Sequence, residues 1–154
     1  MIGKDLHDFA RELWGLNRSL TGEGNRRTLK KIRKHLPELK VCSVPSGTNV
    51  FDWTVPNEWQ VNDAYIITPT GERICDFSQN NLHLVGYSQS INIKISLKDL
   101  KKRLHSLPEQ PNAIPYITSY YNEYWGFCIS HDQLNLLEDG IYHVVIESKL
   151  FAGE

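Results

Sequence analysis

The sequence lacks several features that would assign a protein class at once. Its 154 residues include only three cysteines, Cys42, Cys75 and Cys128, and the formal net charge is −1. Cysteines so few and so widely spaced form neither a disulfide framework nor a zinc ribbon, and we expect them to be buried as small hydrophobic residues. A balanced charge gives no electrostatic footprint for nucleic acid or anionic lipid. We therefore expect neither nucleic acid nor a membrane among the partners.

Long hydrophobic runs are also missing. None approaches the ~20 residues that a membrane span requires, and the first ten residues, MIGKDLHDFA, do not have the basic-then-apolar order of a secretion signal. These two absences predict a cytoplasmic protein.

Catalytic signatures are equally scarce. The six histidines occur singly, with no HExxH pair, and there is no GxSxG nucleophile motif. Cys128 and His131 have a helical spacing but not the flanking residues of a cysteine protease. The glycine-containing segment 22–27 follows a helical pattern instead of a strand, so it does not fit a phosphate-binding loop. Four scattered carboxylates could meet only in space: Asp52, Glu58, Asp63 and Asp76. We assign no catalytic residue, no metal ligand and no cofactor to this chain.

What is present is an ordinary globular composition, 40% hydrophobic and 23% charged. Apolar residues at steps of three and four predict a helix from Asp5 to Leu16. A second helix is expected after Thr21, which would be its N-cap, and it should end near Leu36 before a proline. Alternating residues over 39–44 predict a first strand.

The middle of the chain is β-rich. We expect short strands near 51–55, 61–68 and 72–77, the last two as a hairpin, and a half-exposed strand over 91–97. Ser96 should cap a helix over 97–107, and Ser130 a helical turn over 131–137. An irregular loop over 108–118 and a long final strand over 141–147 complete the pattern. The fold class is therefore α+β.

Six cations between residues 26 and 34 could suggest nucleic-acid binding. The helix that carries them has no aromatic residue for base stacking, so a solvated helix face is the better interpretation.

Aromatic residues give the strongest binding signal. We select five candidates, whose broad faces and polar tips suit a peptide or carbohydrate ligand: Trp53, Trp59, Tyr120, Tyr121 and Trp125. The alternative is that these rings form the core of a small β-rich block, and the sequence favours that alternative.

Longer motifs then become recognisable. They run in order from RSLTGEG at residue 18, through VPSGT at 44, VFDWTVP at 50, NLH at 81, IPY at 114 and TSYY at 118, to WGFC at 125. Together they resemble a bacterial aminopeptidase-like family associated with polysaccharide biosynthesis, over nearly the whole chain. The resemblance implies a zinc aminopeptidase fold, related to the M28 peptidases, that is interrupted by an inserted domain of unknown function and followed by a winged-helix domain.

The resemblance also implies a division of this chain. Residues 1–45 would begin an incomplete α/β aminopeptidase-like domain, 46–130 would be the inserted α+β domain, and 131–154 would return into the first domain. Family members are more than twice as long, and their zinc-binding stretch follows the point matching residue 154. We therefore expect a catalytically incomplete N-terminal region, which is a fragment, the product of a truncated gene or half of a split gene, with zinc only in full-length members. Its partner would be a separately encoded catalytic half, or a second copy joined through an open sheet edge. The alternative function is a non-catalytic module that uses the aromatic residues.

Overall fold

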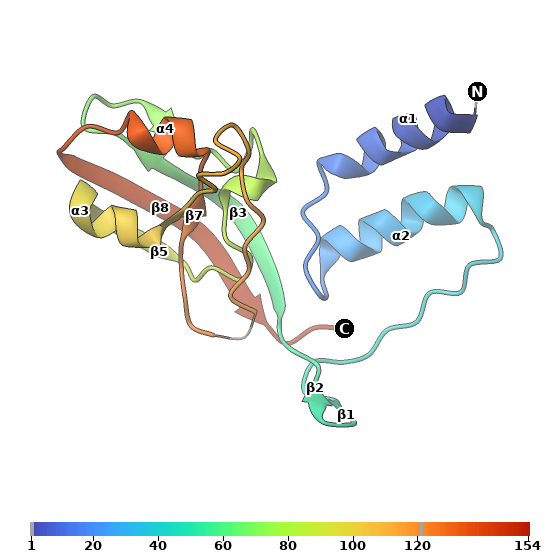
Figure 1. Cartoon of the computed structure of the whole chain (residues 1–154). Coiled ribbons are helices and arrows are strands. Elements are labelled where there is room, and N and C mark those ends of the chain that lie inside the picture. The colour runs from blue at the N-terminus through green and yellow to red at the C-terminus, as the bar shows by residue number, and fades with distance from the viewer. Residues whose placement is uncertain (1, 121) are drawn as a thin grey trace. The chain divides into compact units, whose positions relative to one another are not determined.

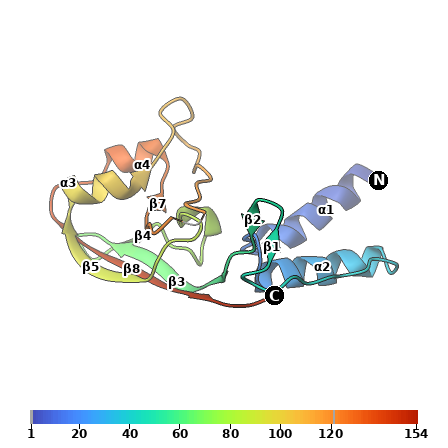
Figure 2. The ribbon, with the colours of Figure 1, turned by 90° about the horizontal axis from the view of Figure 1, so that it is seen from below.

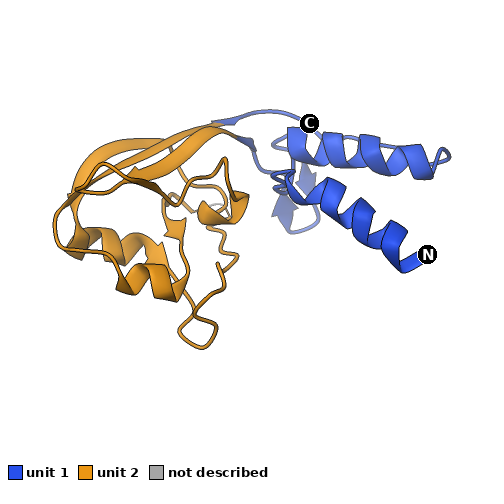
Figure 3. Ribbon diagram, turned by 90° about the horizontal axis from the view of Figure 1, so that it is seen from above, with its two compact units in different colours: residues 1–60, 150–154 blue, residues 61–149 orange. Residues whose placement is uncertain are grey.

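A computed structural model of the chain describes residues 2–120 and 122–154 (Figure 1). It contains two compact units, one made of residues 1–60 and 150–154 and the other of residues 61–149 (Figure 3). Helices and sheets occur together, so the predicted α+β class is confirmed.

The first unit contains two helices and a small hairpin. Helix α1 (Ile2–Trp14) and helix α2 (Glu23–His35) confirm both predicted helices. The rings of Phe9 and His35 meet edge-on with centroids 4.8 Å apart, and Lys31 pairs with Glu12, so the two helices lie side by side. Strands β1 (Asn49–Val50) and β2 (Trp53–Thr54) pair antiparallel.

The start of α2 differs from the prediction. Its N-cap is Gly22 and not Thr21, and no side chain caps the helix. Gly22 has a φ of 115°, a conformation that glycine adopts at no steric cost. The chain is instead held by the side chain of Asn25, which donates to the carbonyl oxygens of Ser19 and Leu20. The turn geometry thus overrides the preference of threonine for the N-cap.

The strand predicted over 39–44 is wrong. These residues are irregular, and Val41 and Val44 are 48% and 45% exposed. A strand exists only beside a hydrogen-bonded neighbour, and no segment in the described part of the chain pairs with this one.

The second unit is built on a four-stranded sheet in the order β4–β3–β8–β5. Strands β3 (Glu58–Ile67) and β4 (Arg73–Ile74) form the predicted hairpin, with Ile66 opposite Ile74. Strands β5 (Ile91–Ser96) and β8 (Ile141–Phe151) pair antiparallel, with Ile93 opposite Val144. Both strands were predicted, although β8 runs four residues further than expected.

Two short helices cover one face of this sheet (Figure 2). Ser96 caps α3 (Leu97–Leu100) and Ser130 caps α4 (His131–Asn135), as predicted. The helix expected over 97–107 is too long, because α3 gives way to a 3₁₀ turn, η2 (Lys101–Arg103), and then to strand β6 (Leu104–His105). Strand β6 pairs parallel with β7 (Phe127–Cys128), which the sequence did not predict. A second 3₁₀ turn, η1, spans Asn81–His83.

The hydrophobic core lies in the second unit. The largest fully buried apolar side chains there are those of Tyr142, Phe127, Ile66, Leu100 and Ile129. Cys75 and Cys128 are buried, as predicted, but Cys42 is exposed because it lies in the irregular 39–44 segment.

The strand predicted in the 131–154 segment shares its sheet with strands from residues 58–96. The assignment of 1–45 and 131–154 to an aminopeptidase-like domain, with 46–130 as its insert, stays a prediction.

Candidate functional site

A buried carboxylate is the centre of a charged cluster in the first unit. Glu58, the first residue of β3, is 2% exposed. Its two carboxylate oxygens accept hydrogen bonds from Nη1 and Nη2 of Arg26 at 2.7 and 2.8 Å, and the backbone N–H of Glu154 donates at 3.0 Å. The bonds from Arg26 lower the pKa of Glu58 despite its burial and raise the pKa of Arg26. The Glu58 carboxylate and the Arg26 guanidinium are therefore both charged.

Ser46 fastens the same C-terminal residues. Its N–H donates to the carbonyl oxygen of Gly153 at 2.8 Å, and the N–H of Gly153 donates to its Oγ at 3.0 Å. A Cβ atom at Gly153 would lie 2.5 Å from Cδ of Glu58, so a larger residue would displace the carboxylate that Arg26 holds. Arg26 and the N–H of Glu154 donate to Glu58, and Ser46 binds Gly153. We call these residues the anchor, because their hydrogen bonds hold residues 153–154 in place.

Sequence reasoning named both members of this pair without joining them. Glu58 was one of four scattered carboxylates, and Arg26 belonged to the cationic helix. No residue of that helix is buried, and the solvated-face interpretation of its cations stays a prediction. The two residues are 32 positions apart, so no local sequence pattern predicts their ion pair.

Two further predicted carboxylates share one cation. Arg73 donates to Asp63 at 2.7 Å and to Asp76 at 2.6 and 3.0 Å, while its guanidinium lies 3.8 Å from the ring centroid of Tyr65. The bonds from Arg73 lower the pKa of Asp76 to about 2. Asp52 is exposed and lies outside this group.

The five candidate aromatic residues divide between the units. Trp53 and Trp59 belong to the first unit, and Tyr120 and Trp125 to the second. Tyr121 lies outside the described residues. Trp59 is 6% exposed, so protein atoms cover its ring, whereas Trp53 and Tyr120 are 39% and 53% exposed. Ligand binding by these residues stays a prediction.

Trp125 takes part in a cation–π cluster within the second unit. The guanidinium of Arg103 lies 5.1 Å from the ring centroid of Trp125 and 4.9 Å from that of Tyr124. The hydroxyl of Tyr124 is 2.9 Å from Nε2 of His105. This packing holds the rings of Tyr124 and Trp125 beside Arg103.

Metal and thiol chemistry find no support among the described residues. In residues 2–120 and 122–154, no three His, Cys, Asp or Glu side chains are grouped so that they could hold a metal ion. Burial raises the pKa of Cys75 and of Cys128 to about 12, so neither is a thiolate at neutral pH. The residues present therefore do not fit a zinc site.

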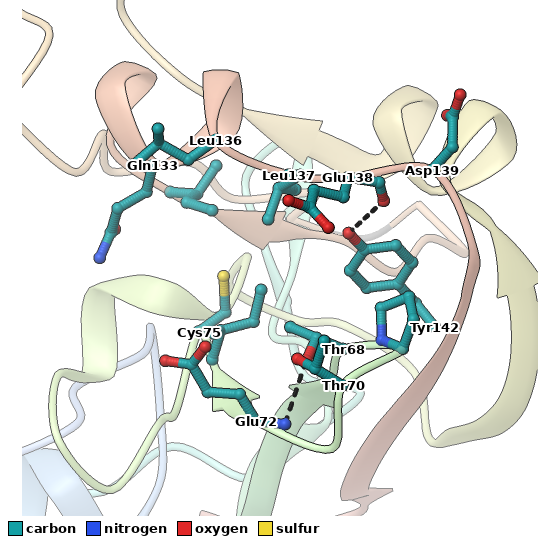
Figure 4. Close-up of a pocket in the computed structure, with 13 residues that line it drawn as sticks. Thr68, Thr70, Glu72, Cys75, Gln133, Leu136, Leu137, Glu138, Asp139 and Tyr142 are labelled. Carbon is teal, nitrogen blue, oxygen red and sulfur yellow. Dashed lines mark hydrogen bonds between the residues drawn. The ribbon is translucent and has the colours of Figure 1, made fainter.

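A pocket of about 420 Å³ lies in the second unit (Figure 4). One wall is the β3–β4 hairpin, residues 68–75, and the other is the segment from α4 to the start of β8, residues 133–142. The hydroxyl of Tyr142 donates to the carbonyl oxygen of Glu138 at 2.7 Å. Burial, with the nearby charge of Glu138, raises the pKa of Tyr142. Sequence analysis did not predict this pocket, because its walls come from turns about 65 residues apart.

No helix in the described part of the chain is both long and apolar enough to cross a lipid bilayer.

The second unit of the chain matches a known sequence family. Residues 58–149, which include the pocket and all but the last two residues of the four-stranded sheet, match the family described as "Domain of unknown function (DUF2172)". The chain belongs to this family. The DUF2172 match covers more than half of the chain and begins at Glu58, the carboxylate of the anchor.

The names of the matched relatives of this DUF2172 protein refer to peptidases. The chain is 45% identical over 151 residues to a protein of Clostridium acetobutylicum named "Putative polysaccharide biosynthesis protein with aminopeptidase-like domain", covering 98% of this chain and 35% of that protein. A crystal structure titled as a "putative peptidase" from Clostridium acetobutylicum superposes with a TM-score of 0.93 at 45% identity, covering 99% of this chain and 36% of that chain. The chain thus spans about a third of the length of the relatives it matches.

Proposed function

We propose that this chain is the N-terminal region of an aminopeptidase-like protein and that its first unit docks onto further polypeptide. By itself the chain is catalytically incomplete. The observation that carries the proposal is the exposed apolar surface of the first unit.

That surface is large for so small a unit. Neither α1 nor α2 buries a single residue, although both have apolar stripes at helical spacing. Of the fifteen exposed large hydrophobic residues described, eleven lie in the first unit: Ile2, Leu6, Trp14, Leu20, Leu36, Val41, Val44, Phe51, Trp53, Leu150 and Phe151. A concentration of exposed large apolar residues in one unit is typical of a region that binds other protein.

The length of the relatives indicates what covers the face. The matched relatives have nearly twice as much further polypeptide as the part that this chain spans. Residues 150–154 belong to the first unit, so polypeptide that followed residue 154 would leave from the unit that carries the exposed face. The unpaired segment 39–44 would also gain a strand partner there.

We assign the expected zinc site to the same further polypeptide. A hydrolytic zinc site needs about three protein ligands and an open position for water. Because the described residues offer no such set, zinc and the M28-like catalytic residues would come from the part of the protein that this chain does not span.

The test uses the chain together with the part of the Clostridium acetobutylicum relative that it does not span. We expect the two polypeptides to co-elute as a 1:1 complex in size-exclusion chromatography with light scattering. Leu6→Asp combined with Trp14→Asp should abolish the complex, because it places charge on the exposed stripe of α1. The control is Arg27→Asp with Lys34→Asp, which changes the charge on the cationic face of α2 and should leave the complex intact.

Three results would contradict the proposal. The first is equal binding by the Leu6/Trp14 variant. The second is a homodimer of the chain that the same variant disrupts, because a second copy would then cover the face. The third is stoichiometric zinc with release of p-nitroaniline from leucine p-nitroanilide by the purified 154-residue chain.

A further inference from the structure

The two walls of the pocket in the second unit meet at one end. A Cβ atom at Gly140 would lie 2.4 Å from Cγ of Pro69, so the two turns touch at this end of the pocket. On the hairpin side, Oγ1 of Thr68 accepts from the N–H of Glu72 at 3.0 Å and closes the turn. The two turns therefore pack directly against each other at one end of the pocket.

The floor of the pocket is apolar and buried. Ile129 and Tyr142 are each 1% exposed, and Cys75 is 5% exposed. The thiol of Cys75 points into the cavity (Figure 4). The thiol is free and buried, and burial raises its pKa to about 12, so an uncharged weak donor faces the space. An apolar floor of this kind favours an aliphatic group.

The rim carries negative charge alone. Three of the described lining residues are acidic, Glu72, Glu138 and Asp139, and none is Lys, Arg or His. Arg73, next in sequence to Glu72, is held by Asp63 and Asp76. Figure 4 shows the carboxylate of Glu138 turned into the pocket and that of Asp139 turned away from it. The carboxylate that faces the apolar floor is therefore that of Glu138, an exposed residue at the rim of the pocket.

We propose that this pocket binds a ligand with a primary ammonium group next to a short aliphatic chain, such as the amino end of a peptide with an apolar first residue. Glu138 accepts the ammonium group, and the floor of Ile129, Cys75 and Tyr142 receives the aliphatic chain. A volume of about 420 Å³ lies within the usual range for small ligands, about 300 to 1,000 Å³.

A neutral sugar fits this pocket less well. Sugar sites present an open aromatic face for stacking, and the aromatic ring lining this pocket, that of Tyr142, is buried with its hydroxyl bound to Glu138. The proposal does not depend on the docking function, because every lining residue belongs to the second unit.

The test is a titration of the isotope-labelled chain with leucinamide, followed by the amide chemical shifts in NMR. The pH should be about 6.5, where α-amino groups, with a pKa of about 7.7 to 8.0, are protonated. We expect saturable shifts confined to residues 68–75 and 129–142. N-acetyl-leucinamide has the same aliphatic chain without the charge and should produce no saturable shift. Glycinamide has the charge without the chain and should bind more weakly than leucinamide.

Variants locate the charge. Glu138→Gln should raise the Kd for leucinamide at least about fivefold, the effect expected from losing one charge-assisted hydrogen bond. Asp139→Asn is the matched control and should change the Kd less than about twofold, because its carboxylate faces away. Equal binding of the acetylated compound, equal effects of the two variants, binding of glucose in preference to leucinamide, or no shifts at the solubility limit would overturn the proposal.

Discussion

Glu58 is the residue whose replacement we expect to cost the first unit most. Glu58→Gln removes the charge that Arg26 binds in a bidentate manner, while leaving a side chain of the same size at a site that is 2% exposed. Breaking a fully buried pair costs about 3–5 kcal/mol, but the side chain of Arg26 is 44% exposed, and solvent screening reduces this to about 1–3 kcal/mol. Urea unfolding followed by tryptophan fluorescence measures the loss, because Trp14, Trp53 and Trp59 all lie in the first unit.

The loss should depend on pH with a definite sign. Arg26 lowers the pKa of Glu58 in the folded state from an ordinary value of 4.5. The stabilisation is therefore present above pH 4.5 and disappears as the pH falls through the lower folded pKa. The difference between wild type and variant should be constant near neutrality and shrink in acid. Glu23→Gln is the control, because Glu23 binds the same guanidinium at 3.0 Å from a 67% exposed side chain. A loss from Glu23→Gln equal to that from Glu58→Gln would contradict this account.

We predict that the two serine N-caps stabilise the short helices of the second unit. Oγ of Ser96 accepts from the N–H of Asp99 at 3.3 Å, and Oγ of Ser130 from that of Gln133 at 3.2 Å. Ser96→Ala and Ser130→Ala should each lower the free energy of unfolding by about 0.5–2 kcal/mol. Thr21→Ala should cost less than either, because the buried Thr21 hydroxyl binds no described group. Thermal unfolding of the three variants decides the order, and a larger loss from Thr21→Ala would show that Thr21 caps α2.

The elements that sequence predicted well are those fixed by local chemistry. The apolar stripes of α1 and α2, the serine caps and the alternation of β5 need only neighbours in the chain. The errors come from long-range partners. Residues 39–44 alternate like a strand but have no strand partner among the described residues, and Leu104 leaves a helical pattern to pair with Phe127. The pocket and the Arg26–Glu58 pair are long-range in the same sense, which is why their residues were named separately or not at all.

Stability should be distributed unevenly between the two units. The second unit has its own core, whereas Leu16, Val55 and Trp59 are the buried hydrophobic residues described in the first. Hydrogen exchange of the chain alone should show strong protection in β5 and the part of β8 that pairs with it, and weak protection throughout α1 and α2. Exchange measured by mass spectrometry tests this directly. Protection in α1 equal to that in β8 would mean that the first unit is already complete.

The two proposals assign separate tasks to the two units. The first presents an unfilled apolar face to further polypeptide, and the second carries a pocket with acidic and aliphatic walls. Each can fail without the other, since the first is tested by complex formation and the second by a small amine. If both hold, the chain would combine a scaffold surface with recognition of a free amino group.

The anchor around Glu58 bears on how this polypeptide should be divided for laboratory use. The family match runs from residue 58 to residue 149, so a recombinant fragment cut at those limits would retain the Glu58 carboxylate and discard Arg26 and the Glu154 amide that donate to it. Cut points that keep the pairing intact must include α2 at one end and Glu154 at the other.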